Sequence, residues 1–156
     1  MKKLTTILAA VALIISSSAF ASSGVNVTEK VNTAFQTSFT GASNVSWTKS
    51  DQFYFAHFML NNDEVSVAYN EDGELLGTSH IIDKSALPQA ITYSLKDQYG
   101  DFAVNASVTK IELADKVTYF ITLSNKTNSL RVKSSEEGVL AVEKKTKNPL
   151  RVGRVY

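Results

Sequence analysis

The sequence predicts an α+β fold, a tandem repeat of one helix followed by a four-stranded antiparallel meander, with each helix packed on one sheet face. Two helical stretches match each other at an offset of 60 residues, and two sets of alternating strand patterns match at an offset of 65. The turn residue Gly73 recurs as Gly138 at the second offset. Apolar residues recur every three or four positions in the helices and every two in the strands, which separates the two element types.

The two expected helices each carry one apolar stripe, over residues 27–39 and 87–99. Asn26, with Glu29 three residues later, is the candidate N-cap of the first helix. Pro88 stands near the first turn of the second helix, where a missing backbone N–H costs nothing. Both stripes are typical of helices that cover a sheet.

Four strands are expected after each helix, because turn residues interrupt the alternating pattern at regular intervals. Gly73 and Gly138 are expected to take a positive φ in hairpin turns. The change of offset from 60 to 65 places five extra residues near 100–106 in the second half. The predicted strands are 44–49, 53–60, 64–70 and 74–81 in the first half, and 106–113, 117–124, 129–135 and 139–145 in the second.

The first 21 residues have the three-part layout of a secretory signal peptide, with Lys2 and Lys3, an apolar run and the triplet Ala19-Phe20-Ala21. Cleavage is expected after Ala21, and the apolar run is too short to span a membrane. We therefore expect a periplasmic or secreted protein without a membrane span. The predicted organisation is a signal peptide over 1–21, a first repeat over 22–82, a second repeat over 83–146 and a basic tail over 147–156.

Composition excludes several classes of function. The chain is 44% hydrophobic and 20% charged, as in ordinary globular domains, and it has no cysteine for a disulfide, a thiolate metal site or a thiol nucleophile. Without residues 1–21 it has 14 Lys and Arg against 15 Asp and Glu, too few positive charges for a nucleic-acid partner. His57 and His80 lie in different predicted strands, and no serine sits in a nucleophile elbow. We expect no catalytic site, no metal and no cofactor.

The repeat also separates the two faces of the expected sheets. One face is apolar in both copies and is expected to lie under the helix. The opposite face differs between the copies, and its side chains are the candidate partner-binding residues. The open alternative is that the two sheets, or two protomers of a homodimer, bury this face against each other. The candidates are Phe53, Phe55, His57, Met59 and Phe120, with Arg131 and Lys133 as charged flanks.

The order of these motifs resembles a known family. The pattern is Val45-x-Trp47, Phe53-Tyr54-x-Ala56-x-Phe58, Val65-x-Val67-x-Tyr69, Asp72-Gly73-Glu74-Leu75-Leu76 and Leu87-Pro88, followed by a helix ending at Tyr99. It resembles the PepSY-like, or β-lactamase-inhibitor-like (BLIP-like), domains of exported bacterial proteins, over about residues 25–145. The resemblance implies a tandem helix-and-sheet fold, an exported address and protein binding through a concave sheet face. Unlike the relative that grips a β-lactamase, this chain has no cysteine.

These observations lead to a functional hypothesis. We expect a non-catalytic exported binding module, similar to BLIP-like proteins, that binds a protein or peptide through the free sheet face. The alternative is a periplasmic carrier of a small apolar ligand, which would need a cavity between helix and sheet. The sequence names no partner.

Overall fold

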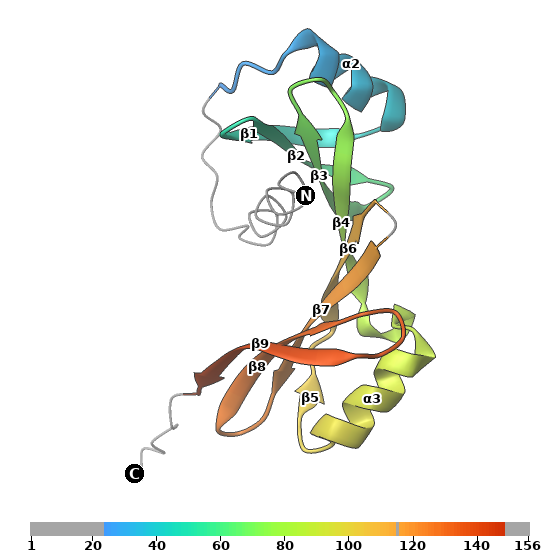
Figure 1. The fold of residues 1–156 in the computed structure, drawn as a ribbon, viewed down its shortest axis with the longest axis vertical. Coiled ribbons are helices and arrows are strands. Elements are labelled where there is room, and N and C mark those ends of the chain that lie inside the picture. Colours follow the sequence, from blue (N-terminus) through green and yellow to red (C-terminus); the bar gives the residue numbers. More distant parts are fainter. Residues whose placement is uncertain (1–23, 115, 149–156) are drawn as a thin grey trace, which may run out of the picture. The chain divides into compact units, whose positions relative to one another are not determined.

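The computed structural model describes residues 24–114 and 116–148 of the 156-residue chain. Two α-helices, one short 3-10 helix and nine strands lie within these residues (Figure 1). The helices are α2 (Glu29–Ser38), η1 (Lys84–Ala86) and α3 (Gln89–Tyr99). The strands are β1 (Ser43–Ser50), β2 (Phe53–Leu60), β3 (Asp63–Asn70), β4 (Leu75–Asp83), β5 (Ala103–Val104), β6 (Ser107–Leu113), β7 (Lys116–Ser124), β8 (Asn128–Ser134) and β9 (Leu140–Lys147).

The sheet topology corrects the predicted fold class. A tandem repeat of one helix and a four-stranded meander is wrong, because all nine strands belong to one antiparallel sheet and the described chain is mostly β. The strand order is β1-β2-β3-β4-β6-β7-β8-β9, with β5 paired to β7 off this path. Two separate meanders would leave β4 and β6 as edge strands with unpaired backbone groups, and pairing these two strands satisfies them.

The bounds of the individual strands agree with the sequence-based prediction, although the predicted fold class does not. All eight predicted strands exist, with ends shifted by at most two residues. The ninth strand, β5, lies within the five extra residues and pairs Ala103 with Ser124 and Val104 with Leu123. The predicted signal peptide and most of the basic tail, from 149 onward, lie outside the described residues. Neither described α-helix is long and apolar enough to cross a membrane.

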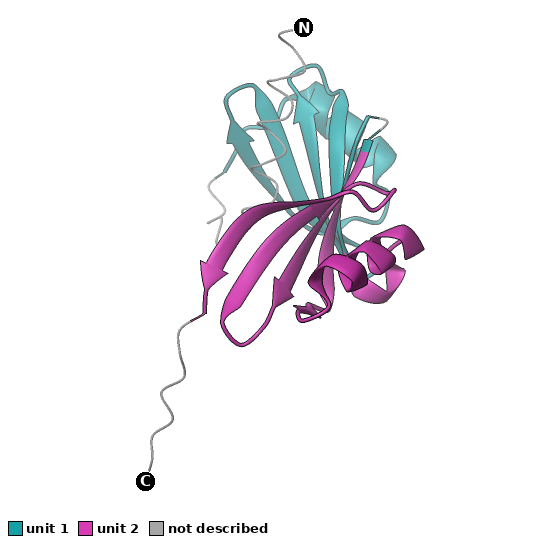
Figure 2. Ribbon diagram, turned by 60° about the horizontal axis from the view of Figure 1, so that its bottom comes forward, with its two compact units in different colours: residues 1–81, 111–116 teal, residues 82–110, 117–156 magenta. Residues whose placement is uncertain are grey.

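The chain divides into two compact units, coloured separately in Figure 2. Unit 1 comprises 1–81 with 111–116, and unit 2 comprises 82–110 with 117–156. The end of β6 therefore completes unit 1, although its start belongs to unit 2. Each unit contains one of the two described α-helices, with its own buried cluster.

The core of unit 1 lies between α2 and the sheet. Val31 and Phe35 of α2 are buried against the face of β2 and β3 that the sequence predicts. Phe35 contacts Phe58 edge-on, with ring centroids 5.0 Å apart, and Trp47 at 5.2 Å. Burying side chains of this size stabilises the fold by about 1.5–3 kcal/mol each. The full buried cluster is Val31, Phe35, Tyr54, Ala56, Phe58, Val65, Val67 and Tyr69.

The core of unit 2 is built in the same way, and its face prediction is also confirmed. Ile91 and Leu95 of α3 are buried, with β6, β7 and β8 supplying the other side. Partly buried Leu140 of β9 packs at its margin. The full cluster is Ile91, Leu95, Val108, Tyr119, Ile121, Leu123, Leu130 and Val132.

A glycine turn touches the first part of each helix. Gly73 (φ +81°) and Gly138 (φ +83°) have the predicted positive φ values. A Cβ atom added to Gly73 would lie 2.9 Å from the carbonyl oxygen of Lys30, and one added to Gly138 would lie 2.6 Å from that of Ala90. Glycine is therefore required at both turns for backbone conformation and for close approach to the helix.

The N-cap of α2 differs from the prediction. The cap is Thr28, whose hydroxyl accepts a hydrogen bond from the Val31 N–H at 3.4 Å, and not Asn26. Thr28 precedes the first helical residue directly, as a capping side chain must. Pro88 is the residue before α3, and no side chain caps that helix.

Candidate functional site

The predicted binding residues of unit 1 fall into two groups by exposure. Phe53 and Phe55 are buried, with 8% and 3% of their surface exposed, and they form a small cluster with Ala68 and the partly buried Leu76. This cluster lies apart from the one under α2. A partner cannot reach either ring without rearrangement of the strand.

His57 and Met59 are half-buried on the same strand. The imidazole Nδ1 of His57 lies 2.7 Å from the Ser66 hydroxyl on β3, directly across the strand pair. Burial lowers the pKa of His57 below its ordinary value, and the negative charge of Glu64 offsets part of that decrease. The side chain is therefore held neutral and hydrogen-bonded, which is typical of a positioned structural histidine.

The predicted residues of unit 2 lie together on β7 and β8. Phe120 is half-buried, and the Arg131 guanidinium lies over its ring at 5.4 Å from the centroid. Lys133 is exposed and sits directly opposite Phe120 in the strand register. Arg131 Nε is also 3.9 Å from the Glu143 carboxylate of β9. We call Phe120, Arg131 and Lys133 the basic face.

Lysines of β9 extend this positive charge, although the sequence places Lys144 and Lys145 in the last predicted strand of the second repeat and Lys147 in the predicted basic tail, and none of them was predicted to bind a partner. Lys144 lies opposite Arg131, because the turn at 135–139 and one register shift bring β9 back along β8. Alternation along β9 could have indicated this neighbour, but the register shift between Arg131 and Val132 changes the pairing by one residue. The shift is invisible in the pattern of apolar residues.

Charge is distributed unequally between the two units. Unit 1 without residues 1–21 contains 3 lysines and 9 acidic residues, whereas unit 2 contains 11 Lys and Arg and 6 acidic residues. The whole chain is close to neutral, so this separation is not visible in its net charge of +1. The basic face thus belongs to a unit that attracts anionic groups.

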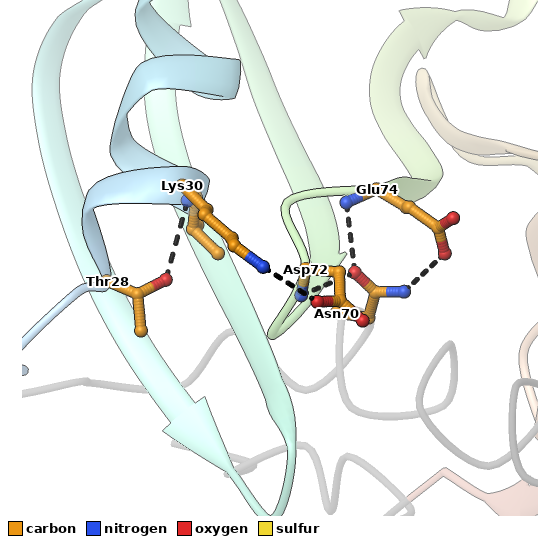
Figure 3. A network of polar contacts seen from close by, with 6 residues as sticks. Thr28, Lys30, Asn70, Asp72 and Glu74 are labelled. Atoms are coloured by element: carbon orange, nitrogen blue, oxygen red, sulfur yellow. Dashed lines mark hydrogen bonds and ion pairs between the residues drawn. The ribbon is translucent and has the colours of Figure 1, made fainter.

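A polar network holds the turn after β3 against α2 (Figure 3). The side-chain oxygen of Asn70 accepts from the backbone N–H groups of Asp72 and Glu74 at 3.0 and 2.9 Å. Lys30 Nζ donates to the Asp72 carboxylate at 3.1 Å. Both side chains of this ion pair are largely exposed, so it contributes little to stability. The network fixes the shape of this turn.

A second polar cluster joins β1 and β2. Lys49 Nζ donates to Tyr54 Oη at 3.0 Å and to Glu71 Oε1 at 3.2 Å. These hydrogen bonds raise the pKa of the Lys49 amine. The amine is therefore protonated at neutral pH and can act neither as a base nor as a nucleophile.

Metal chemistry has no visible site in the described part of the chain. No group of three His, Asp or Glu side chains lies close enough together there to hold a metal ion. The features that remain as a candidate site are the basic face of unit 2 and the neighbouring charges of β9.

This fold, one nine-stranded antiparallel sheet with a helix in each compact unit, is similar to the folds of solved structures described as a BLIP-like protein and as DUF2874 family proteins. The chain is similar to a BLIP-like protein from Bacteroides fragilis, with 19% identity and a TM-score of 0.65 over 84% of this chain and 96% of that one. It is similar to a DUF2874 family protein from Bacteroides ovatus, with 19% identity and a TM-score of 0.66 over 80% and 89% of the two chains. A third similar structure, from Bacteroides eggerthii, is described as one of the "putative periplasmic proteins", with 16% identity and a TM-score of 0.66 over 79% and 90%.

These likenesses confirm the predicted resemblance to BLIP-like proteins at the level of the fold. The descriptions of the similar structures do not mention a PepSY domain, so that part of the resemblance stays a prediction. No protein-family model matches the sequence. No curated protein matches it either.

Proposed function

We propose that this chain is a non-catalytic binding module that acts in the periplasm and binds a protein or peptide partner through the basic face of unit 2. The observation that carries the proposal is the Arg131 guanidinium over the half-buried ring of Phe120, with Lys133 beside them. Aromatic residues and arginine are the side chains most enriched at protein interfaces.

The chemistry of this face suits recognition better than catalysis. The half-buried Arg131 over the Phe120 ring keeps a planar donor group in a fixed orientation, ready to bind a carboxylate on a partner. Phe120 supplies an apolar surface at the same place, and the β7–β8 pairing holds both residues on a rigid support. A phenyl ring and a guanidinium group contribute contact area and hydrogen-bond donors, which suit recognition.

The fold supports the same proposal from another direction. A BLIP-like protein and a described periplasmic protein share this architecture, and the predicted signal peptide gives this chain an exported address. We extend the binding role to this chain as a hypothesis and assign no β-lactamase as its partner.

The residues of unit 1 that the sequence predicts as partner contacts have different roles in this proposal. Phe53 and Phe55 support the sheet from their buried cluster, and His57 is held by Ser66. Met59, half-buried near the C-terminal end of β2, is the unit 1 side chain that remains a candidate contact.

A capture experiment with a matched control tests the proposal. The tagged protein is incubated with a periplasmic extract, and captured proteins are identified for the wild type, for Phe120→Ser with Arg131→Ala, and for Tyr93→Ser. Tyr93 is an aromatic residue on α3 with 73% of its surface exposed, so it controls for the loss of any exposed ring. We expect a partner that the Tyr93 variant retains and the double variant loses. A partner retained by both folded variants would contradict the proposal.

A further inference from the structure

Strand β9 forms one edge of the nine-stranded sheet. It ends the strand order and pairs with β8 alone within the described residues (Figure 1). All residues of β9 except Leu140 are exposed. An edge strand of this length presents a row of backbone donors and acceptors that can accept another strand.

The hydrogen-bond phase of β9 identifies which of its backbone groups point outward. Asn148 N–H donates to the Thr127 carbonyl at 2.8 Å, just beyond the end of the strand pair. Bonded and non-bonded residue pairs alternate along an antiparallel ladder. Because Asn148 belongs to a bonded pair, Thr146 and Lys144, two and four residues earlier, belong to bonded pairs as well. The N–H of Lys144 therefore points toward β8. The N–H and C=O groups of Lys145 and Lys147 point away from β8.

The side chains of β9 make this edge strongly basic. Lys144, Lys145 and Lys147 lie within four consecutive positions, and alternation places Lys144 on one face and the other two lysines on the opposite face. Glu143, the one acidic residue of the strand, lies near Arg131. Positive charge therefore borders the open backbone edge on both faces.

This charge selects between two kinds of incoming strand. Two copies of β9 pairing edge to edge would bring their lysines together, and like charges on neighbouring strands are destabilising. An extended segment that carries Asp or Glu on either of its faces would instead meet opposite charge there while it forms backbone hydrogen bonds.

We infer that β9 is a docking edge for an acidic, extended segment of a partner protein, which adds to the sheet as a further strand. The inference rests on the proposed function, because it names the chemistry of the partner that the basic face of unit 2 would bind. Arg131 lies opposite Lys144 in the register, so the edge and the basic face are continuous. The backbone supplies affinity in this mode, and the lysines supply selectivity.

The experiment uses a fluorescein-labelled peptide of four Glu-Val repeats and a control peptide of four Lys-Val repeats, titrated against the protein purified from a periplasmic fraction. Lys145→Pro removes one outward N–H and one charge, whereas Lys145→Gln removes the charge alone. Proline is tolerated at such a position because its ring replaces an N–H that does not bond β8. Far-UV circular dichroism and thermal unfolding check that each variant is folded.

We expect the Glu-Val peptide to bind and the Lys-Val peptide not to bind. Lys145→Pro should weaken binding roughly tenfold relative to Lys145→Gln, since the lost contact is one backbone hydrogen bond. Independently of any variant, the bound Glu-Val peptide should slow hydrogen exchange at the Lys145 and Lys147 amides in the wild-type protein. This measurement keeps the inference testable if the proline variant does not fold.

Equal binding by the two Lys145 variants, equal binding of the two peptides, or unchanged exchange at these amides would overturn the inference. Failure of the Glu-Val peptide to bind would overturn it as well. The proposed function would survive those results, because the capture experiment with Phe120 and Arg131 reports on the basic face separately. If the Phe120 and Arg131 double variant captures the same partner as the wild type while the Glu-Val peptide still binds β9, the basic face is not the binding site. The docking edge at β9 would then stand without it.

Discussion

The contact between the glycine turns and the helices can be measured by giving three glycines a Cβ atom. Gly41, Gly73 and Gly138 all have a positive φ, at +92°, +81° and +83°. An added Cβ at Gly41 would meet no atom of the described residues within 4 Å, whereas at Gly138 it would lie 2.6 Å from the Ala90 carbonyl oxygen and 2.9 Å from Ser94 Oγ. Gly41→Ala therefore isolates the conformational cost, which Gly138→Ala shares.

The expected loss of stability in each variant is the sum of two costs, one for the positive φ and one for the close contact of the new Cβ atom with the helix. A left-handed backbone costs a residue with a side chain about 1–2 kcal/mol. A Cβ forced against backbone atoms that must move adds about 1–3 kcal/mol, in the range of overpacked sites. We expect a loss of about 1–2 kcal/mol for Gly41→Ala and about 2–5 kcal/mol for Gly138→Ala. Gly73→Ala should fall between them, because its nearest contact is 2.9 Å from Lys30 oxygen.

Urea unfolding at equilibrium, followed by circular dichroism, gives the free energy of unfolding of each variant from its midpoint at unchanged slope. The ordering of the three losses is the decisive result, because it depends on distance to the helix and not on φ. If Gly138→Ala costs no more than Gly41→Ala, the turn does not press on α3 and the described packing is incorrect.

Three further predictions concern single side chains. Thr28→Ala should destabilise the protein by about 0.5–2 kcal/mol in urea unfolding through loss of the cap of α2, whereas Asn26→Ala should have no measurable effect; equal losses would reject Thr28 as the cap. Tyr69→Phe should leave the unfolding midpoint unchanged or raise it, because the buried Tyr69 hydroxyl makes no hydrogen bond of good geometry to any residue that the structure describes; a loss above about 1 kcal/mol would show that the hydroxyl has a partner. His57 has a lowered pKa in the folded protein, so the unfolded chain binds more protons as the pH falls below about 6.5, and stability should be full above that pH and decrease below it. His57→Gln should reduce the decrease in the urea midpoint between pH 7.5 and 5.5, and an identical decrease in both proteins would contradict this origin.

Side-chain periodicity predicted the local elements of this chain well. The apolar stripe containing Val31 and Phe35 and the alternation through Tyr54 and Phe58 both reflect burial, and burial is what a hydrophobic pattern records. The positive φ at Gly138 was also predictable, since few residues other than glycine adopt it readily.

Features that depend on backbone pairing could not be predicted in this way. The β4–β6 pairing that joins the strands into one sheet uses N–H and C=O groups that every residue carries, so it leaves no mark on the side-chain pattern. The same holds for the register shift after Arg131, which sets the position of Lys144.

The sequence predicted some residues of the candidate site better than others, because a side-chain pattern does not show what covers a sheet face. Phe120 and Arg131 lie on neighbouring strands whose register follows from the turn between them, and they are in contact. Phe53 and Phe55 have the same alternation as an exposed strip would have, but both rings are buried. Alternation identifies the face of a strand, and it does not report whether other parts of the molecule cover that face.

The membership of residues 111–116 in unit 1 has a consequence for how the chain reaches its native state. During synthesis, the first 81 residues emerge before residues 111–116, which complete their unit, and about 30 residues of the other unit must emerge in between. A proteolytic cut between 81 and 82 would therefore not release two intact halves. The protein should therefore fold and unfold in one cooperative transition. The end of β6 is the last segment that unit 1 acquires during synthesis.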